Sequence, residues 1–593
     1  MFDNLEEIEK FSPYGGELIL ELINGDNNKF ETAENSVYTQ KGADRTMYSY
    51  VPKSGCPDAK QCQVLMVLRD DDTKESAEKI LEEYKLKDLA EERHFILLFP
   101  NPLNSTWNYL EDERKDDDCS FLVRCFASLP KSKGGVAGFN GMIFYIAFAP
   151  NASAQLAVLS AKYPLDASAI MLGKFPDGFK IPKGENAYQT AWIYEENIQL
   201  LEYLKEVNAP IKEEVCENYH LYKNINNDEI KIFSSNHGID TKEIRLAWED
   251  MFSNARRWRN DTYGTYQRRT NFSKKGFVAH VKDSSLGVND NFEHTWYEYV
   301  PENLRGTTKK VPLLFYFHGG NCIPLYGAEQ SCWHDIADKE GFIVVYPKAS
   351  TKKRWNVWNT EGEPSDFDFV LALIKHMKEL YPIDDTRIYV SGFSMGSMMT
   401  NALCCAYPEI FAAGAAYNGQ NFGYLGNEIS TFVSLNMAPP VSKEAFDKVS
   451  NTKIIADKKK EKYDYRMPLI QSSGLLDNLG ETAWPIKSKD NLWADTINYW
   501  KAYNNIDVKE FEYNETYETG LFGDENGYDC DDQRFIHHKW FTNDDSHLPL
   551  YQFVVAKRMP HAVDLREIEI GWNFIKHYRR NSDGSLFYME NGK

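Results

Sequence analysis

The chain has 593 residues, of which 42% are hydrophobic, and a formal net charge of −21 at pH 7. This length and composition suffice for two globular domains that each bury a full core. The acidic charge argues against nucleic acid or an anionic membrane surface as a partner, and no apolar run reaches the roughly 18 residues of a membrane span.

The first residues, Met1 to Glu7, lack the basic stretch and apolar run of a secretory signal. We therefore expect a cytoplasmic protein with reduced cysteines. The ten cysteines show no metal-ligand spacing, and we expect neither a metal nor an organic cofactor. In an exported form, a bridge between Cys56 and Cys62 or between Cys322 and Cys332 would be conceivable.

Two halves of the chain carry the same segments in the same order. The stretch Arg45 to Pro52 parallels His294 to Pro301, and these and the other matching segments lie about 248 residues apart. Such a near-constant spacing indicates an internal duplication. The other matches are Phe99-Pro100 with Tyr346-Pro347, Trp107-Asn108 with Trp355-Asn356, Phe121 with Phe369, and Tyr163-Pro164 with Tyr407-Pro408. His237 and Trp248 are eleven residues apart, as His561 and Trp572 are, although the second pair lies 324 residues after the first. We predict one domain over residues 1–259 and a second over 260–593, with the junction in the polar stretch 256–275.

A strand and a glycine loop open the second half of this pattern. Val311 to Phe317 is a continuous apolar run typical of a buried strand, and His318-Gly319-Gly320-Asn321 follows it. A loop in this place can aim backbone N–H groups at a developing oxyanion. We expect Gly320 and Asn321 to supply one of these donors.

The most specific motif is Gly392-Phe393-Ser394-Met395-Gly396. A β-branched and aromatic run, Arg387 to Val390, precedes it, and a helix-forming stretch, Met398 to Ala406, follows it. A serine on a sharp strand-to-helix turn, with small neighbours, is typical of a hydrolase nucleophile. The pattern predicts Ser394 as the nucleophile and the N–H of Met395 as an oxyanion donor.

These motifs carry a family resemblance. Residues 311 to 420 resemble the polyhydroxybutyrate depolymerase-like esterases, a group of α/β-hydrolases that includes feruloyl and acetylxylan esterases. The matching segments are His318-Gly319-Gly320, Ile336-Ala337-Asp338, Gly341 to Pro347, Trp355 to Trp358, Ser365 to Phe369, Tyr381 to Asp384, and Arg387 to Met399. From residue 420 onward only two short neighbourhoods match. The resemblance implies an α/β fold for this half, with parallel strands flanked by helices, and a serine carboxylic-ester hydrolase.

The general base and the acid are expected after the serine, in the order Ser, acid, His. His561 is the best base, because it follows the apolar strand Tyr551 to Ala556 and precedes an amphipathic helix. Asp477 follows the strand-like run Met467 to Gly474 and would orient the histidine. Asp490 and Glu481 are nearby carboxylates that the sequence leaves open.

Two insertions and three tryptophans are candidates for substrate recognition. We expect insertions near 421–466 and 508–549, largely missing from the first half, to lie beside the nucleophile as a lid or pocket wall. Trp355, Trp358 and Trp484 are aromatic residues able to stack on a sugar or phenolic ring, and packing in the core is an equally good account of each.

The first half lacks the catalytic groups. Either Pro150 or Ala149 stands opposite Ser394, and Arg69-Asp70-Asp71-Asp72 replaces the oxyanion loop. Carboxylates there would oppose an oxyanion. We predict a degenerate α/β-hydrolase-like domain without activity, in which His237 is a remnant.

The sequence therefore predicts tandem α/β-hydrolase-like domains with a Ser394–His561–Asp477 triad and an acyl-enzyme intermediate in the second. The resemblance implies feruloyl, acetyl or hydroxyalkanoate esters, carried by a small molecule or an oligosaccharide. The alternatives are a serine peptidase of the prolyl-oligopeptidase type, which usually carries an upstream β-propeller, and a binding protein in which both copies are inactive. The acyl group, the alcohol and the oligomeric state do not follow from the sequence.

Overall fold

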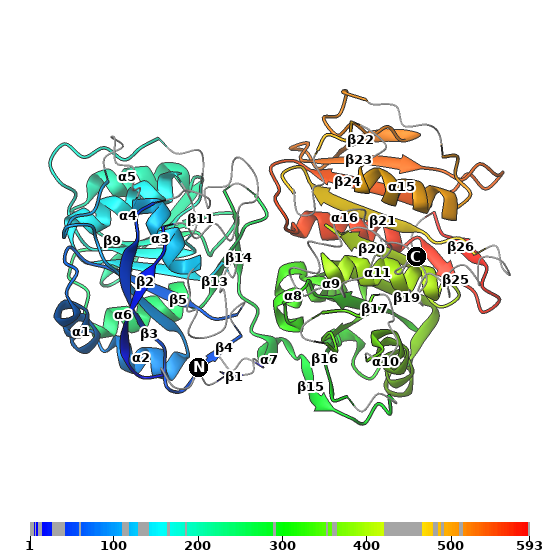
Figure 1. Ribbon diagram of the computed structural model, residues 1–593, viewed down its shortest axis with the longest axis horizontal. Helices are drawn as coiled ribbons and strands as arrows, with labels where there is room; N and C mark the ends of the chain where they lie inside the picture. The colour runs from blue at the N-terminus through cyan, green and yellow to red at the C-terminus, as the bar shows by residue number, and fades with distance from the viewer. Residues whose placement is uncertain are drawn as a thin grey trace. The chain divides into compact units, whose positions relative to one another are not determined.

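The computed structural model describes residues 5, 8–9, 15–25, 42–58, 61–109, 118–127, 141–162, 166–183, 187–261, 263–288, 292–351, 354–357, 364–419, 465–477, 484–487, 491–508 and 514–590. The chain forms two compact units (Figure 1). The N-terminal unit is Glu6–Thr270, and the C-terminal unit is Asn271–Lys593 with Met1–Leu5. No helix in the described ranges is both long and apolar enough to cross a membrane.

The boundary between the units falls at 270/271, later in the chain than the expected 259/260. The hairpin β13 (Ala255–Trp258) and β14 (Thr265–Arg268) spans the expected position. Its polar sequence is misleading, because Arg256 and Arg257 are buried. The N–H of Arg257 donates to the carbonyl of Gly141 at 2.9 Å, which ties the hairpin to the N-terminal unit.

The C-terminal unit is built on a ten-stranded sheet in the order β15-β16-β18-β17-β19-β20-β21-β24-β23-β22. The neighbours from β18 to β24 are parallel, and the two strands at each end are antiparallel. The strands are β15 (Val278–Asp283), β16 (His294–Tyr299), β17 (Val311–Phe317), β18 (Ile343–Pro347), β19 (Ile383–Phe393), β20 (Ala413–Tyr417), β21 (Leu469–Gly474), β22 (Glu525–Asp529), β23 (Phe535–Trp540) and β24 (Tyr551–Ala556), with a separate ribbon of β25 (Tyr578–Arg580) and β26 (Leu586–Tyr588). The helices are α7 (Phe272–Lys275), α8 (Pro324–Ser331), α9 (Trp333–Glu340), α10 (Asp366–Leu380), α11 (Met395–Ala406), α15 (Leu492–Tyr503) and α16 (Leu565–Ile575), with a 3-10 turn at Glu302–Leu304.

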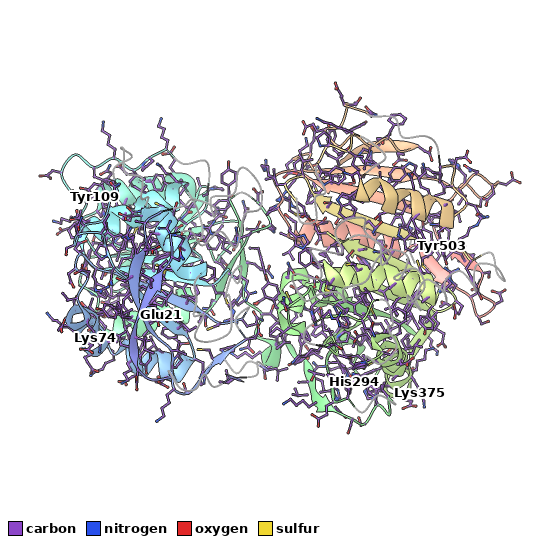
Figure 2. The ribbon with its side chains drawn as sticks, viewed as in Figure 1. Glu21, Lys74, Tyr109, His294, Lys375 and Tyr503 are labelled. Atoms are coloured by element: carbon purple, nitrogen blue, oxygen red, sulfur yellow. The ribbon has the colours of Figure 1, made fainter. Side chains whose placement is uncertain are left out.

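Helices cover both faces of this sheet, which is why its central strands are apolar throughout. All seven residues of β17 are buried, and alternate side chains enter opposite layers. Leu313, Phe315 and Phe317 pack in one layer with α10, α11 and α15. Leu314 and Tyr316 pack in the other layer with α8, α9 and α16. Figure 2 draws these side chains and labels Tyr503, the last residue of α15.

The N-terminal unit has the same strand order. Its ten-stranded sheet runs β2-β3-β6-β5-β7-β8-β9-β12-β11-β10, so each strand corresponds in turn to one from β15 to β22 in the other sheet. The strands are β2 (Leu18–Ile23), β3 (Arg45–Tyr50), β5 (Val64–Leu68), β6 (Ile96–Pro100), β7 (Ile143–Ala147), β8 (Ser168–Met171), β9 (Thr190–Tyr194), β10 (Ile211–Val215), β11 (Tyr219–Asn224) and β12 (Lys231–Ser235), with a separate pair of β1 (Ile8–Glu9) and β4 (Cys56–Pro57). The helices are α1 (Lys74–Glu83), α2 (Leu86–Arg93), α3 (Asp118–Ala127), α4 (Pro150–Lys162), α5 (Ile198–Val207) and α6 (Thr241–Ala247), which runs into a π-helical turn at Trp248–Phe252. Two large, mostly parallel sheets flanked by helices confirm the expected α/β class.

Local contacts repeat between the units as well. The indole N–H of Trp107 donates to the carbonyl of Arg69, and that of Trp355 donates to the carbonyl of His318, both at 2.7 Å. Each terminal helix begins with an aspartate capping box, at Asp240 in α6 and Asp564 in α16. The matched strand order and the matched contacts both support the duplication.

Part of the insertion expected near 508–549 belongs to the sheet. Its described residues include β22 and β23, which extend the sheet antiparallel to β24. The N-terminal unit has the equivalent strands β10 and β11 beside β12. The residues that form β22 and β23 are therefore not an insertion, because the N-terminal unit has counterpart strands, and the prediction for the rest of the segment stays a prediction. The structure does not describe residues 420–464, and these include almost all of the insertion expected near 421–466.

Candidate active site

Ser394 lies on the sharp turn between β19 and α11. Its backbone has φ 55° and ψ −118°, a conformation that costs energy for a residue with a side chain. A Cβ on Gly392 would lie 2.2 Å from the carbonyl oxygen of Gly396, and one on Gly396 would lie 1.9 Å from that of Phe317. Both glycines of the motif are therefore required by the close packing of this turn.

The turn is held by backbone bonds and leaves its serine accessible. The N–H of Ser394 donates to the carbonyl of Tyr417 on β20 at 2.9 Å, and its carbonyl accepts from Met398 at 3.1 Å. From residue 391 to 400, Ser394 is the one position that is not buried. This is the environment that an attacking hydroxyl needs.

The glycine loop after β17 lies against the serine. A Cβ on Gly319 would be 3.4 Å from the Cβ of Ser394, so the loop approaches the turn closely. Asn321 has φ 53°, which turns the chain after Gly320. The N–H of Met395 opens α11 and has no acceptor within the helix. The loop that carries Gly320 and Asn321 therefore begins beside Ser394.

Trp355 supports this loop from inside the core. Its side chain is 1% exposed, and its indole bonds the carbonyl of His318. His318 accepts from the N–H of Ala349 through Nε2 at 3.1 Å, which leaves the proton on Nδ1, 2.7 Å from the carbonyl of Gly319. A substrate ring cannot reach Trp355, so its predicted substrate contact was wrong, and its role is to hold the loop. Trp358 lies outside the described residues.

The predicted base and acid are in contact. Nδ1 of His561 lies 2.8 Å from Oδ2 of Asp477. The Asp477 side chain is 3% exposed and that of His561 is 26% exposed, so the carboxylate is enclosed and the imidazole is accessible. Asp490 and Glu481, the alternatives, lie outside the described residues.

The histidine also lies beside the nucleophile turn. Its ring centroid is 4.9 Å from that of Phe393, the residue before Ser394. The hydrogen bonds among the described residues do not include one from Ser394 Oγ to His561. Such bonds are often long in a free enzyme and tighten when substrate binds.

Asn418 connects these segments and was missed in the sequence. It follows β20 with φ 49° and is 3% exposed. Its Oδ1 accepts from the N–H of Gly474 at 2.9 Å, at the start of the turn to Asp477, and its Nδ2 donates to the carbonyl of Ala562, next to His561. The available signal was an asparagine and a glycine directly after a buried strand.

Trp484 remains near the site. It is partly exposed, and its indole donates to the hydroxyl of Ser473 on β21 at 3.2 Å. The strand ends at Gly474, and Asp477 follows in the next turn. Its ring also packs near Trp493 and Phe553, with centroids 6.4 and 5.8 Å away, and its contact with a substrate stays a prediction.

The equivalent region of the N-terminal unit has no nucleophile. Leu68 pairs with Ala147 as Phe317 pairs with Gly392, and this register puts Ala149 opposite Ser394. Burial raises the pKa of the nearby Asp70, although the backbone N–H groups of Asn151 and Ala152 bond its carboxylate and oppose the shift. A carboxylate therefore occupies the start of α4, where an oxyanion would bind in an active copy. His237 faces the backbone carbonyl of Gly238.

Known proteins resemble the region around the serine. Residues 297–449 match the family described as "Esterase PHB depolymerase". A "Bifunctional acetylxylan esterase/xylanase XynS20E" of Neocallimastix patriciarum is 38% identical over 123 residues, 21% of this chain and 17% of that protein. A "Feruloyl esterase B" of Thermothelomyces thermophilus is 34% identical over 134 residues, 21% of this chain and 44% of that protein. These matches confirm the resemblance expected for residues 311 to 420.

The chain spans less than half the length of either relative. Among solved structures, an "Acetyl xylan esterase from Aspergillus awamori" is 18% identical and covers 51% of this chain and 98% of that chain, with a TM-score of 0.34. A TM-score of 0.34 is too low to assign any property of that structure to this chain.

Proposed function

We propose that the C-terminal unit is a serine carboxylic-ester hydrolase. Ser394 attacks the ester carbonyl, His561 accepts the proton and returns it to the leaving alcohol, and Asp477 holds the imidazole. The oxyanion is stabilised by the N–H of Met395 and by the loop at Gly320 and Asn321. Water then hydrolyses the acyl-enzyme.

One observation carries this proposal. A strained, accessible serine at a strand-to-helix turn lies against a glycine loop, and a histidine paired with an enclosed carboxylate packs on the same turn. Each part has a defined task in acyl transfer. The names of the relatives support feruloyl or acetyl esters as the substrate class, and hydroxyalkanoate esters remain within the proposal.

The upstream unit separates this proposal from a prolyl-oligopeptidase-like peptidase. Such peptidases usually carry a β-propeller there, whereas this chain carries an α/β sheet. We further propose that the N-terminal unit is non-catalytic, because Ala149 and Asp70 stand where the chemistry requires a nucleophile and N–H donors.

Hydrolysis of p-nitrophenyl acetate and methyl ferulate tests the proposal, together with intact-mass detection of a fluorophosphonate adduct. We expect Ser394→Ala to abolish the adduct. Ser394→Ala and His561→Ala should each lower kcat/KM by roughly 10⁴-fold or more. His237→Ala is the matched control from the duplicate and should leave both unchanged. A folded wild type with no turnover and no adduct would refute the triad and favour the binding-protein alternative.

A further inference from the structure

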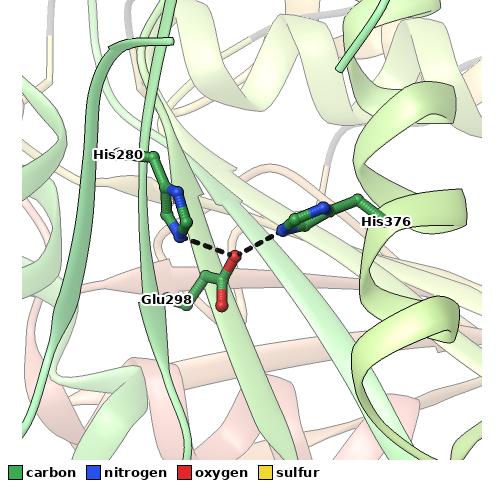
Figure 3. Close-up of side chains that lie close together, drawn as sticks. All are labelled: His280, Glu298 and His376. Atoms are coloured by element: carbon green, nitrogen blue, oxygen red, sulfur yellow. Dashed lines mark hydrogen bonds and ion pairs between the residues drawn. The ribbon is translucent and has the colours of Figure 1, made fainter. Parts of the chain in front are cut away.

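Three side chains from separate elements converge on one face of the C-terminal sheet, away from Ser394 (Figure 3). His280 is on β15, Glu298 on β16 and His376 in the last part of α10. Figure 3 shows both imidazoles approaching one carboxylate oxygen. Nε2 of His280 and Nε2 of His376 each lie 3.2 Å from Oε1 of Glu298.

We propose that His280, Glu298 and His376 bind a divalent metal ion, with zinc as the ion that best suits the donors. Two imidazole nitrogens and one carboxylate oxygen are a common zinc donor set. Bonds of about 2.0–2.2 Å in a tetrahedron place neighbouring ligand atoms roughly 3.3 Å apart. The two observed distances of 3.2 Å match this value, and all three donor atoms lie within 4.8 Å of one another.

The orientation of His280 favours a ligand over a simple ion pair. Its Nε2 is buried and makes no aligned hydrogen bond, although Glu298 is close. The ring stacks on Trp296, with centroids 4.3 Å apart and planes 4° from parallel, so its direction is set by packing. Packing on Trp296 therefore fixes Nε2 of His280 beside Oε1 of Glu298, where it can serve as a ligand.

An outer carboxylate completes the arrangement. Oδ2 of Asp283 lies 3.6 Å from Nδ1 of His280, longer than a hydrogen bond but on the side where the acidic partner of a ligating histidine would lie. On the other side, the indole of Trp296 donates to Oε1 of Glu298 at 2.9 Å, and the hydroxyl of Tyr381 donates to Oε2 at 3.4 Å. Each of these contacts holds a ligand in place.

Glu298 is buried, with a side chain that is 1% exposed. A buried carboxylate needs a cation or several donors; its polar partners here are Trp296, Tyr381 and His376, and a metal ion would add positive charge. Both histidine side chains are 22% exposed, which leaves a path for the ion and for water as a fourth ligand.

The position indicates a structural role. The sheet order places β15 and β16 at the edge, with β18 and β17 between them and β19, so the ion would join two edge strands to the end of α10. The N-terminal unit has Ser49 at the position of Glu298, since Tyr50-Val51-Pro52 repeats Tyr299-Val300-Pro301. The site therefore belongs to the C-terminal unit alone.

Zinc titration of the full chain after chelator treatment tests the inference. We expect saturable binding of one zinc ion per chain by calorimetry at pH 7.5, with weaker binding at pH 5.5 because protons compete for the histidines. Glu298→Gln and His376→Ala should abolish this binding. Asp283→Asn, which alters only the outer carboxylate, should weaken it about tenfold or more.

Two controls make the outcome decisive. His547→Ala removes an exposed histidine elsewhere in the unit and should leave binding unchanged. Cys332→Ser tests the other cluster, Cys332, His334 and Asp335. The proposal would be overturned by any of three results. These are unchanged zinc affinity in both His376→Ala and Asp283→Asn, loss of binding in Cys332→Ser instead, and no saturable binding by wild type.

Discussion

Replacing Asn418 with glycine removes the link between the acid and histidine segments. Glycine tolerates the backbone at φ 49°, so the change isolates the side-chain bonds. The N–H of Gly474 and the carbonyl of Ala562 both lose a buried partner, at about 1–3 kcal/mol each. We expect a loss of about 3 kcal/mol of stability, which corresponds to roughly 6–10 °C in Tm.

The activity should fall by more than the stability loss explains. The two bonds hold the turn before Asp477 and the loop after His561, and a displacement of about 1 Å in such groups can cost roughly 100-fold in rate. We therefore expect kcat/KM for p-nitrophenyl acetate, and the rate of fluorophosphonate labelling, to drop at least tenfold at temperatures where the variant is fully folded.

Asn504→Gly is the matched control. The Asn504 side chain also makes two buried backbone bonds, from the N–H of Met467 at 2.8 Å and to its carbonyl at 2.9 Å, but it does so just before β21 begins. It should lose a similar amount of stability and keep its labelling rate. Equal labelling rates in the two variants would refute the argument that Asn418 positions the catalytic loops.

Three further predictions concern a buried acid and two tryptophans. Burial raises the pKa of Glu567 to about 8, so the folded state binds its proton more tightly, and this stabilisation is lost as pH rises from about 4.5 through 8. Glu567→Gln should therefore have an unfolding free energy above that of wild type between pH 6 and 9, by up to about 5 kcal/mol, and a higher Tm. Glu243→Gln, in the equivalent but partly exposed capping box, should show no such gain. Trp355→Phe should lower the urea unfolding free energy by about 1–2 kcal/mol, because the carbonyl of His318 loses its indole donor; an unchanged value would contradict the loop-supporting role. Trp484→Ala should raise KM for methyl ferulate and leave that for p-nitrophenyl acetate unchanged; equal changes would argue against an aromatic contact.

Features that depend on neighbouring residues could be predicted from the sequence. The steric demand of the turn at Ser394 is met by Gly392 and Gly396, so the motif and its flanking strand and helix indicate the nucleophile directly. The alternating layers of the sheet require continuous apolar strands, and Val311 to Phe317 is recognisable as one of them. Segment order revealed the duplication, because a copied fold keeps its strands in sequence.

Features that depend on distant residues meeting in space could not be predicted. Asp477 was one of three carboxylates until the structure placed it 2.8 Å from His561. Trp355 has an aromatic side chain that could bind a substrate ring, but packing with β17 and α10 buries it. The same holds for His280, Glu298 and His376, which share no sequence motif.

The sequence by itself determined the sharp strand-to-helix turn at Ser394, the α/β class and the duplication, because the backbone conformation of a turn and the burial of a strand are encoded by adjacent side chains. Only the tertiary structure decided which carboxylate pairs with the histidine, that Asn418 joins the loops, and that a buried glutamate lies between two imidazoles. Hydrogen-bond partners and burial depend on how the folded sheets and helices bring remote segments together.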